Sequence, residues 1–354
     1  MIKRKTKALV LGPVPPPVHG FSIAMQNLFF EMKKSSSVTL LNVAGRNSNK
    51  FIRVIQSLAL SLFGCLKIIR SSSSQVNHIA IGCNGGLGSV FTLLLVAACR
   101  MINIDATLHH HSYNYINYRS RIMAVIVAIS NSKIKHIFLS DSMEKEFMLQ
   151  YKAVTSDVVS NAFIVDIPEK NYVRDKVFRV GMLSNLTREK GLLHFLELTD
   201  KARSIGLNIN FILAGPVESM NDLREIQKRE KEFSNLEYVG PIYGHEKDLF
   251  YKNIDTFVFP TDYHNEAQPI VLFEAMAHSV PVISIAKGCI REQVGDYYRI
   301  FESVEEFNKE ILNCLLELSK MSIDEIETLR ESTLSFFISQ RQKSLKSILR
   351  ITSH

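Results

Sequence analysis

Two glutamates, Glu266 and Glu274, stand eight residues apart in a stretch whose pattern places both beside the start of one helix. The apolar run Asp255–Pro260 predicts a buried parallel strand. Pro269 suits the first position of a helix, and the residues after it, Ile270–Ala277, have the composition of one. Glu266 is therefore expected in the loop at the carboxyl end of a strand, and Glu274 inside the helix that follows.

This position favours the binding of an anion. Ligands of open α/β sheets bind outside the carboxyl ends of the strands. The first N–H groups of a helix have no partner within it, so those near Ile270 and Val271 are available to a phosphate.

A second loop, Gly181–Gly191 (GMLSNLTREKG), places two cations after another predicted strand. The cations are Arg188 and Lys190, and fixed cations in a desolvated site stabilise a negatively charged ligand. A Lys-Gly pair in a loop is common by itself, so the assignment depends on the surrounding pattern.

Three histidines, His109, His110 and His111, end another predicted strand. Successive side chains of a strand point to opposite faces, so the three cannot all reach one metal ion. His109 and His111 are expected on one face and His110 on the other. The three histidines are either functional residues or ordinary polar residues at a strand end.

Glycines mark two more loops at strand ends. The first strand leads into the Pro-rich loop Gly12–Ser22, where Gly20 permits close approach of the backbone just before a helix. An ordinary strand-to-helix turn would have the same pattern. Gly85, Gly86 and Gly88 follow another strand, but no acidic residue stands where a dinucleotide fold requires one. The favoured interpretation is that these glycines form a loop that lines a ligand-binding cleft.

Strand and helix patterns alternate along the whole chain, which predicts the α/β class with a doubly wound parallel sheet in each of two Rossmann-like domains. The 354 residues suffice for two cores. We place the domains at 1–165 and 166–330, joined by the polar linker Val165–Lys176, with a C-terminal helix over 331–354. Strands are predicted at Lys7–Leu11, Val38–Asn42, Val76–Ile81, Asp105–His109, Ile137–Leu139, Val158–Val159, Arg179–Leu183, Ile209–Ala214, Leu236–Val239, Phe257–Phe259 and Val282–Ile285, and helices at Ser22–Lys34, Phe51–Arg70 and Asp324–Ile351.

The stretch around the two glutamates resembles the donor-binding signature of the GT-B glycosyltransferases, in particular the retaining family 4 of bacterial polysaccharide synthesis. After the second Glu come Ala275-Met276-Ala277 and a strand that restarts at Pro281-Val282-Ile283, as in that family. Lys190-Gly191 also matches. Met182 stands where the family has an Arg, and Ser279 where it has a helix-ending Gly.

The resemblance implies two domains that face a central cleft, with the C-terminal helix crossing back to the N-terminal domain. It implies a retaining, metal-independent enzyme without a cofactor that moves a sugar from a UDP- or GDP-linked donor to a saccharide or lipid-linked saccharide acceptor. The roles that it implies are contact with the reacting sugar for His111 (His109 as the fallback) and Glu266, ribose binding for Glu274, and phosphate binding for Gly20, Arg188, Lys190, Ile270 and Val271. A nucleotide-sugar epimerase and a non-catalytic nucleotide-sugar-binding paralogue are the alternatives.

Charge is unevenly spread along the chain. Residues 1–165 carry 18 Lys and Arg and 6 Asp and Glu, a net +12, whereas residues 166–354 carry 24 and 29, a net −5. The basic half favours an anionic partner, and without zinc spacing or an aromatic RNA motif nucleic acid is the weakest candidate. The helix Phe51–Arg70 either lies on an anionic membrane or packs its apolar residues on the sheet as a core helix.

Targeting and redox signals are few. The first apolar run is too short for a secretory signal, and Ser89–Cys99 is too short to span a bilayer. The five cysteines stand singly, which predicts free, buried thiols in a reducing compartment. We therefore expect the chain in the cytoplasm, with a place at the inner face of the membrane left open.

Overall fold

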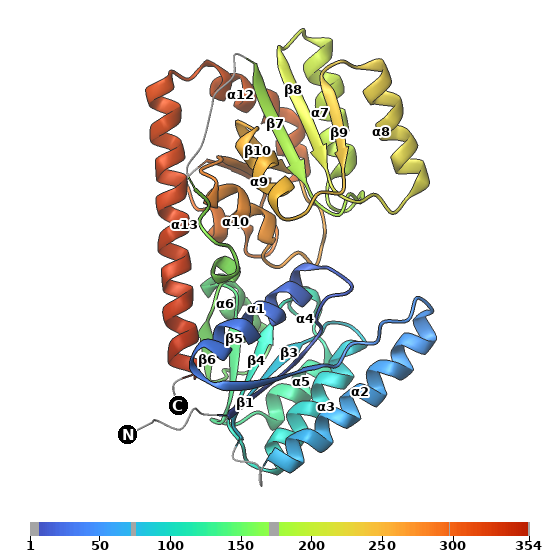
Figure 1. Cartoon of the computed structure of the whole chain (residues 1–354), viewed down its shortest axis with the longest axis vertical. Coiled ribbons are helices and arrows are strands. Elements are labelled where there is room, and N and C mark those ends of the chain that lie inside the picture. Colours follow the sequence, from blue (N-terminus) through green and yellow to red (C-terminus); the bar gives the residue numbers. More distant parts are fainter. Residues whose placement is uncertain (1–6, 72–75, 170–176, 297, 353–354) are drawn as a thin grey trace. The chain divides into compact units, whose positions relative to one another are not determined.

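The computed structural model describes residues 7–71, 76–169, 177–296 and 298–352, so the predicted linker lies outside the described residues from position 170 onward. The chain divides into two compact units. Unit 1 consists of the residues up to Ile164 and from Arg341 onward, and unit 2 of Val165–Gln340. Each unit is built on one six-stranded sheet whose strand pairs are all parallel (Figure 1). The predicted fold class is confirmed.

The sheet of unit 1 has the strand order β2-β1-β3-β4-β5-β6. Its order reverses between β1 and β3, so the loops that carry Gly20 and Gly85 leave the sheet at this switch point. The elements of unit 1 along the chain are β1 (Lys7–Gly12), α1 (Gly20–Ser35), β2 (Ser37–Asn42), α2 (Lys50–Ser71), β3 (Val76–Cys83), α3 (Gly88–Met101), β4 (Ala106–His110), α4 (Asn114–Asn117), α5 (Arg121–Ile129), β5 (Ile134–Phe138), α6 (Asp141–Gln150), β6 (Ser156–Val158) and the 3-10 helix η1 (Asn161–Ile164).

The long C-terminal helix α13 (Ile323–Thr352) begins in unit 2 and ends in unit 1. Its last turns complete the core of unit 1, where Ile348 packs with Val10 of β1 and Met25 of α1. The Ser344 hydroxyl donates to the carbonyl of Ser160 at 2.6 Å. The C-terminal helix therefore returns to the N-terminal domain, as the resemblance implied.

The sheet of unit 2 has the order β12-β11-β10-β7-β8-β9. Its core joins apolar residues of α7, such as Phe195, to Phe211 of the sheet and to Phe307 of α12. The remaining elements are β7 (Phe178–Leu183), α7 (Leu192–Ser204), β8 (Ile209–Ala214), α8 (Met220–Glu232), β9 (Leu236–Gly240), α9 (His245–Lys252), β10 (Thr256–Phe259), α10 (Ile270–Ala277), β11 (Val282–Ile285), α11 (Ile290–Val294), β12 (Arg299–Phe301) and α12 (Val304–Lys320).

Helix α10 spans the predicted residues Ile270–Ala277, but Pro269 is not its first residue as expected. Pro269 is the N-cap and not the first helical residue, because its ψ of 125° is extended. Its carbonyl also accepts a hydrogen bond from Gln293 Nε2 at 2.8 Å. At the other end Ser279 adopts the left-handed φ of +62° that favours glycine. The Val280 N–H reaches back to the Ala275 carbonyl at 2.9 Å. The helix-ending turn is therefore kept although the glycine is absent.

Candidate active site

The strand order of unit 2 reverses between β7 and β10, since β8 and β9 lie on one side of this pair and β11 and β12 on the other. A reversal of this kind is where open α/β sheets bind their ligands, at the carboxyl ends of the strands. The loop that follows β7 carries Lys190, and the loop that follows β10 carries Glu266. The fold thus brings these two predicted residues together from positions 76 residues apart.

Lys190 and Glu266 form an ion pair, with Nζ 2.5 Å from Oε2. The Thr261 hydroxyl donates to the same carboxylate oxygen at 3.3 Å. Glu266 is buried, and the Lys190 side chain is a quarter exposed. The ammonium also lies 4.7 Å from the centre of the Tyr263 ring. A buried carboxylate is thereby held in place by a cation that solvent or a ligand can still reach.

The two loops are locked together through their backbones. Gly191 has a φ of +90°, and a Cβ at this position would lie 2.1 Å from the Pro260 carbonyl oxygen. The Asp262 N–H donates to the Glu189 carbonyl at 2.9 Å. Glycine is required at position 191 by both its conformation and this close approach. The geometry of the Lys190–Glu266 pair is therefore set by rigid backbone contacts.

Glu274 lies inside α10 and is held by two residues of α9. Lys247 forms an ion pair with one carboxylate oxygen, and the Tyr251 hydroxyl donates to the other at 3.0 Å. Burial, and then the charge of Glu274, raise the pKa of Tyr251 well above its usual value, so this hydroxyl stays a donor. Sequence reasoning missed both partners. Their four-residue spacing on one helix is the signal that the sequence offers.

Ile270 and Val271 form the first turn of α10, as predicted, directly after the loop of Glu266. The N–H groups of such a turn have no partner inside the helix and carry the positive end of its dipole. The loop before α11 lies against the same region, since a Cβ on Gly288 would meet the Glu266 carbonyl oxygen at 2.1 Å. A negatively charged ligand beside Lys190 would be stabilised by this helix start.

Arg188 turns away from the Lys190–Glu266 pair. Its Nε and Nη2 both lie 2.9 Å from Oδ1 of Asp222, a buried residue in the first turn of α8. The Arg188 side chain is otherwise largely exposed. Of the two cations predicted for the phosphates, the structure joins Lys190 to the carboxylate of the signature and joins Arg188 to another helix.

The histidines of unit 1 alternate between faces, as predicted. His109 and His111 line one small cavity, and the ring of His111 stacks on Phe21 with 4.9 Å between ring centres. His110 lies on the other side, 2.9 Å from His136 Nδ1 through Nε2. Burial lowers the pKa of His111 to about 3. At neutral pH His111 is therefore an uncharged imidazole.

Gly20 begins α1, and its neighbour His19 caps that helix, because His19 Nδ1 accepts from the Ser22 N–H at 3.2 Å. Gly20 itself is exposed. Asn161 is buried in η1. In the loop after β3, the Gly86 N–H donates to the Asn114 side chain at 3.1 Å.

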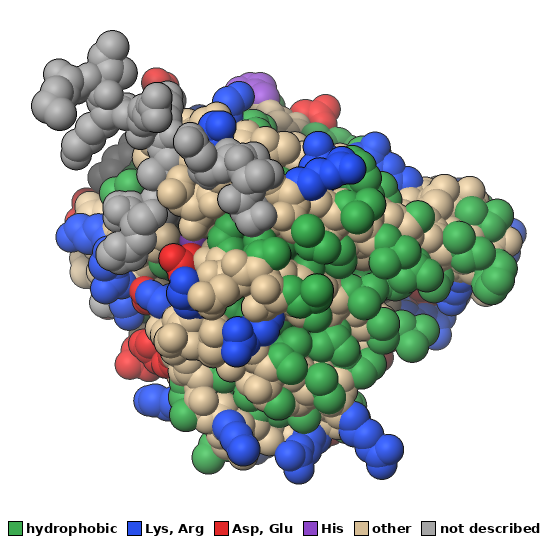
Figure 2. Space-filling model, turned by 90° about the horizontal axis from the view of Figure 1, so that it is seen from below, with side chains coloured by type: hydrophobic (Ala, Val, Ile, Leu, Met, Phe, Trp, Pro, Cys, Tyr) green, Lys and Arg blue, Asp and Glu red, His purple; other side chains and the backbone are tan. Residues whose placement is uncertain are grey.

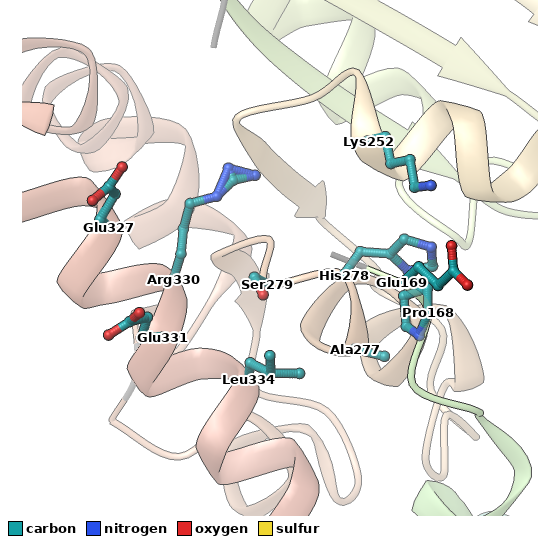
Figure 3. A pocket seen from close by; sticks show the side chains of 10 residues that line it. All are labelled: Pro168, Glu169, Lys252, Ala277, His278, Ser279, Glu327, Arg330, Glu331 and Leu334. Atoms are coloured by element: carbon teal, nitrogen blue, oxygen red, sulfur yellow. The ribbon is translucent and has the colours of Figure 1, made fainter. Parts of the chain in front are cut away.

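A pocket of about 220 Å³ opens beside the C-terminal end of α10 (Figure 3). Lys252, His278 and Arg330 line it together with Glu327 and Glu331, and Arg330 Nη2 donates to the Ile254 carbonyl at 3.3 Å. None of the predicted site residues lines this pocket. In the part of the chain that the structure describes, no group of three or more His, Cys, Asp and Glu is placed to hold a metal ion.

Comparisons with known proteins agree with this architecture. The model of the family described as "Glycosyl transferases group 1" matches residues 164–323. The capsular polysaccharide biosynthesis glycosyltransferase CapM of Staphylococcus aureus is 27% identical over 200 residues, which are 51% of this chain and 51% of that protein. The chain thus matches about half the length of this curated relative.

Solved structures share the fold along almost the whole chain. Anabaena Alr3699/HepE, solved with UDP and glucose, has a TM-score of 0.65 at 13% identity, over 97% of this chain and 99% of that one. The lipopolysaccharide outer core galactosyltransferase WaaB has a TM-score of 0.66 at 13% identity, with the same coverage. Together with the family match, these findings support a GT-B glycosyltransferase. The family match covers the segment that contains Lys190, Glu266 and Glu274.

Proposed function

We propose that the chain is a retaining glycosyltransferase of bacterial surface polysaccharide synthesis, which moves a sugar from a nucleotide-sugar donor to a saccharide or lipid-linked saccharide acceptor. The observation that carries this proposal is the Lys190–Glu266 ion pair at the switch point of the second sheet, inside the segment that matches the glycosyltransferase family. The likeness to a protein solved with UDP and glucose makes a UDP-linked donor the first to test, and a GDP-linked donor the second.

The proposed chemistry assigns charge stabilisation to groups at the start of α10. A lysine ammonium has three donors and Glu266 takes one, so Lys190 can also face a donor phosphate. The N–H groups of Ile270 and Val271 would add to its field. These groups would stabilise the charge that grows on the departing diphosphate, which is the role that makes them catalytic and not only binding groups. In this scheme no metal ion is needed for that charge.

The carboxylates would fix the two ends of the donor. Glu266, held by Lys190 and Thr261, would contact the transferred sugar, and Glu274 would accept from the ribose hydroxyls. Retention follows if the acceptor hydroxyl attacks on the face that the diphosphate vacates. The new bond from the acceptor oxygen to the anomeric carbon forms as the bond to the phosphate oxygen breaks, and that phosphate oxygen takes the hydroxyl proton. His111, which is uncharged at neutral pH, would contact the reacting sugar, as the resemblance implies.

Incubation with UDP-, GDP- and dTDP-sugars tests the proposal. Thermal stabilisation would select the donor, and NMR of the product would give the anomeric configuration. We expect transfer or slow hydrolysis with the donor's configuration retained. An inverted product would contradict the retaining mechanism. Isomerisation of the sugar without transfer would identify an epimerase, and binding without turnover of any donor or acceptor a non-catalytic protein.

A further inference from the structure

Helix α2 packs against the rest of unit 1 mainly through small side chains, and most of its large apolar side chains face solvent. The buried residues of the helix are, with one exception, small: Ser57, Ser61, Gly64, Ile68 and Ser71. Their spacing of three or four places them on one face. A Cβ on Gly64 would lie 2.9 Å from Cδ2 of Leu95 in α3. A Cβ on Gly64 would also lie 3.2 Å from Cδ2 of Leu11 in β1, so the helix packs on the sheet, as one alternative expected. Most of its large apolar residues, however, lie outside the core.

The outward face is apolar along its whole length. Phe51 is 74% exposed, Leu62 50% and Leu66 53%. The other large apolar residues exposed on the helix are Ile52, Val54, Ile55, Leu58, Phe63 and Ile69. Seen from below, hydrophobic side chains gather over one side of the molecule, with Lys and Arg at the margins of the area (Figure 2). A contiguous apolar surface of this kind marks a site of interaction.

All charged side chains of helix α2 are positively charged. Residues 50–71 contain no Asp or Glu, and all four cations, Lys50, Arg53, Lys67 and Arg70, are exposed. Lys67 Nζ lies 5.5 Å from the centre of the Phe63 ring. An apolar face bordered only by cations is complementary to a bilayer with an anionic headgroup region.

We propose that the outer face of α2 lies in the interface of an anionic lipid bilayer and holds unit 1 on the membrane. A second copy of the chain fits this face less well, because two copies of α2 would bring their cations together without a carboxylate from either helix. An anionic bilayer supplies both an apolar interior for the exposed apolar side chains and negative charge for the four cations. The proposal is independent of the transferase chemistry, and it gives a lipid-linked acceptor a route to the enzyme.

The helix lies in the membrane plane in this proposal and does not span it. Among the described residues, α2 is the one helix whose length and composition would suffice to cross a bilayer. Gly64 packs against Leu95 of α3, however, and Ser57 and Ser61 are buried, so a spanning helix would lose this packing and expose both serines to lipid. Only the outward half of the helix is free to enter the interface.

Co-sedimentation of the full chain with vesicles tests the proposal. We expect binding to phosphatidylcholine vesicles that contain phosphatidylglycerol, little binding to phosphatidylcholine alone, and release as salt rises. Equal recovery in the supernatant with both vesicles at low salt would overturn it, as would equal binding to both. Donor turnover without any vesicle binding would overturn the membrane proposal and leave the proposed function standing.

Paired variants locate the surface. Leu62→Gln with Leu66→Gln should weaken partitioning roughly tenfold or more, since two exposed leucines are lost from the interface. Arg53→Glu with Lys67→Glu should abolish the preference for anionic lipid. Matched controls with exposed residues elsewhere are Leu149→Gln on α6 and Lys228→Glu with Lys231→Glu on α8, which should bind as the wild type does. Controls that lose as much binding, or a dimer in solution that the double glutamine variant dissociates, would overturn the proposal.

Discussion

The two units share a six-stranded parallel sheet but use their polar residues in opposite ways. In unit 2 the charged groups of the site are paired across loops and helices, as in Lys190–Glu266 and Lys247–Glu274. In unit 1 buried histidines are stacked among aromatic rings, such as His110 on Phe138. The first arrangement fixes charges for a ligand that carries charge. The second keeps its histidines neutral and leaves its cations on the surface.

This contrast indicates which kind of ligand or partner each unit is suited to bind. A charged ligand needs counter-charges in fixed positions, and unit 2 has partly buried ion pairs held by loops and helices. A partner without fixed shape, such as a lipid surface, needs only an apolar face and a charge of one sign, as α2 provides. If the comparison is right, single substitutions in unit 2 should change chemistry, whereas unit 1 should respond to groups of surface residues and to pH.

The largest effect is expected at Lys190. Lys190→Ala should lower kcat by roughly 10²–10³-fold, because the cation acts most strongly on the charge of the departing diphosphate. Lys190→Arg should recover part of the loss. Lys228→Ala, an exposed lysine of α8, is the matched control and should leave kcat unchanged. Steady-state kinetics separates the roles, since a rise in KM alone would make Lys190 a uniform binding group.

A smaller effect is expected at Glu274. Glu274→Ala removes the acceptor assigned to the ribose and should weaken the binding of the free nucleotide by about 1.5–3 kcal/mol, the worth of a hydrogen bond to a charged group. Isothermal titration calorimetry with UDP and GDP measures the change directly. Glu197→Ala on the exposed side of α7 is the control. Unchanged nucleotide binding in Glu274→Ala would remove this residue from the donor site.

The strand–loop–helix unit around Glu266 and Glu274 could be predicted from the sequence because its features are local. Glu266, Pro269 and Glu274 lie in one strand–loop–helix unit, and the predicted helix Ile270–Ala277 is observed, with Pro269 as its N-cap and not as its first residue. The partners that complete the site come from elsewhere. Lys247 approaches Glu274 from α9, 27 residues away, and Asp222 approaches Arg188 from α8, 34 residues away. Such pairs depend on how helices lie on the sheet, and a spacing such as that of Lys247 and Tyr251 shows only that two residues share a helix face, not which carboxylate they meet.

Helix α2 shows a second limit, which concerns the direction of a helix and not its existence. Its bounds were predicted to within one residue at each end. Its apolar residues were assigned either to a core or to a membrane, because a large apolar stripe suits both. The deciding signal was the stripe of Ser57, Ser61 and Gly64, since small residues at this spacing allow two helices to approach closely. In α2 the small residues are buried and most of the large apolar residues are exposed, which reverses the usual pattern of a core helix.

The acid sensitivity of unit 1 should exceed that of unit 2. Burial lowers the pKa of His111 to about 3 and that of His136 to about 4, and it also lowers the pKa of His109 and His110. Below the unfolded pKa of about 6.5 the unfolded chain binds protons that the folded unit does not. Stability is therefore complete above that pH and falls as the pH drops, by up to about 1.4 kcal/mol per pH unit for each histidine.

Hydrogen exchange at pH values of about 7 and 5.5, corrected for intrinsic rates, compares the two units in one sample. Peptides from β4 and β5 should lose more protection than peptides from β8 and β10. His136→Asn should reduce the pH slope in unit 1, because one titrating group is removed while a side-chain amide remains near His110. Equal losses of protection in both units would show that the buried histidines do not control the acid response.

The smallest effect is expected at Arg188, and its test decides what this residue does. Arg188→Ala should lower kcat/KM by less than about tenfold, since the guanidinium is held at Asp222 and not at the Lys190–Glu266 pair. Any loss could come from a phosphate contact or from the buried Asp222 carboxylate that the substitution leaves without its cation. Arg188→Ala combined with Asp222→Asn separates the two. Recovery of activity in the double variant would make Arg188 a structural partner of α8. A loss that persists there, together with weaker binding of nucleoside diphosphate but not of nucleoside, would restore Arg188 to the phosphate site beside Lys190.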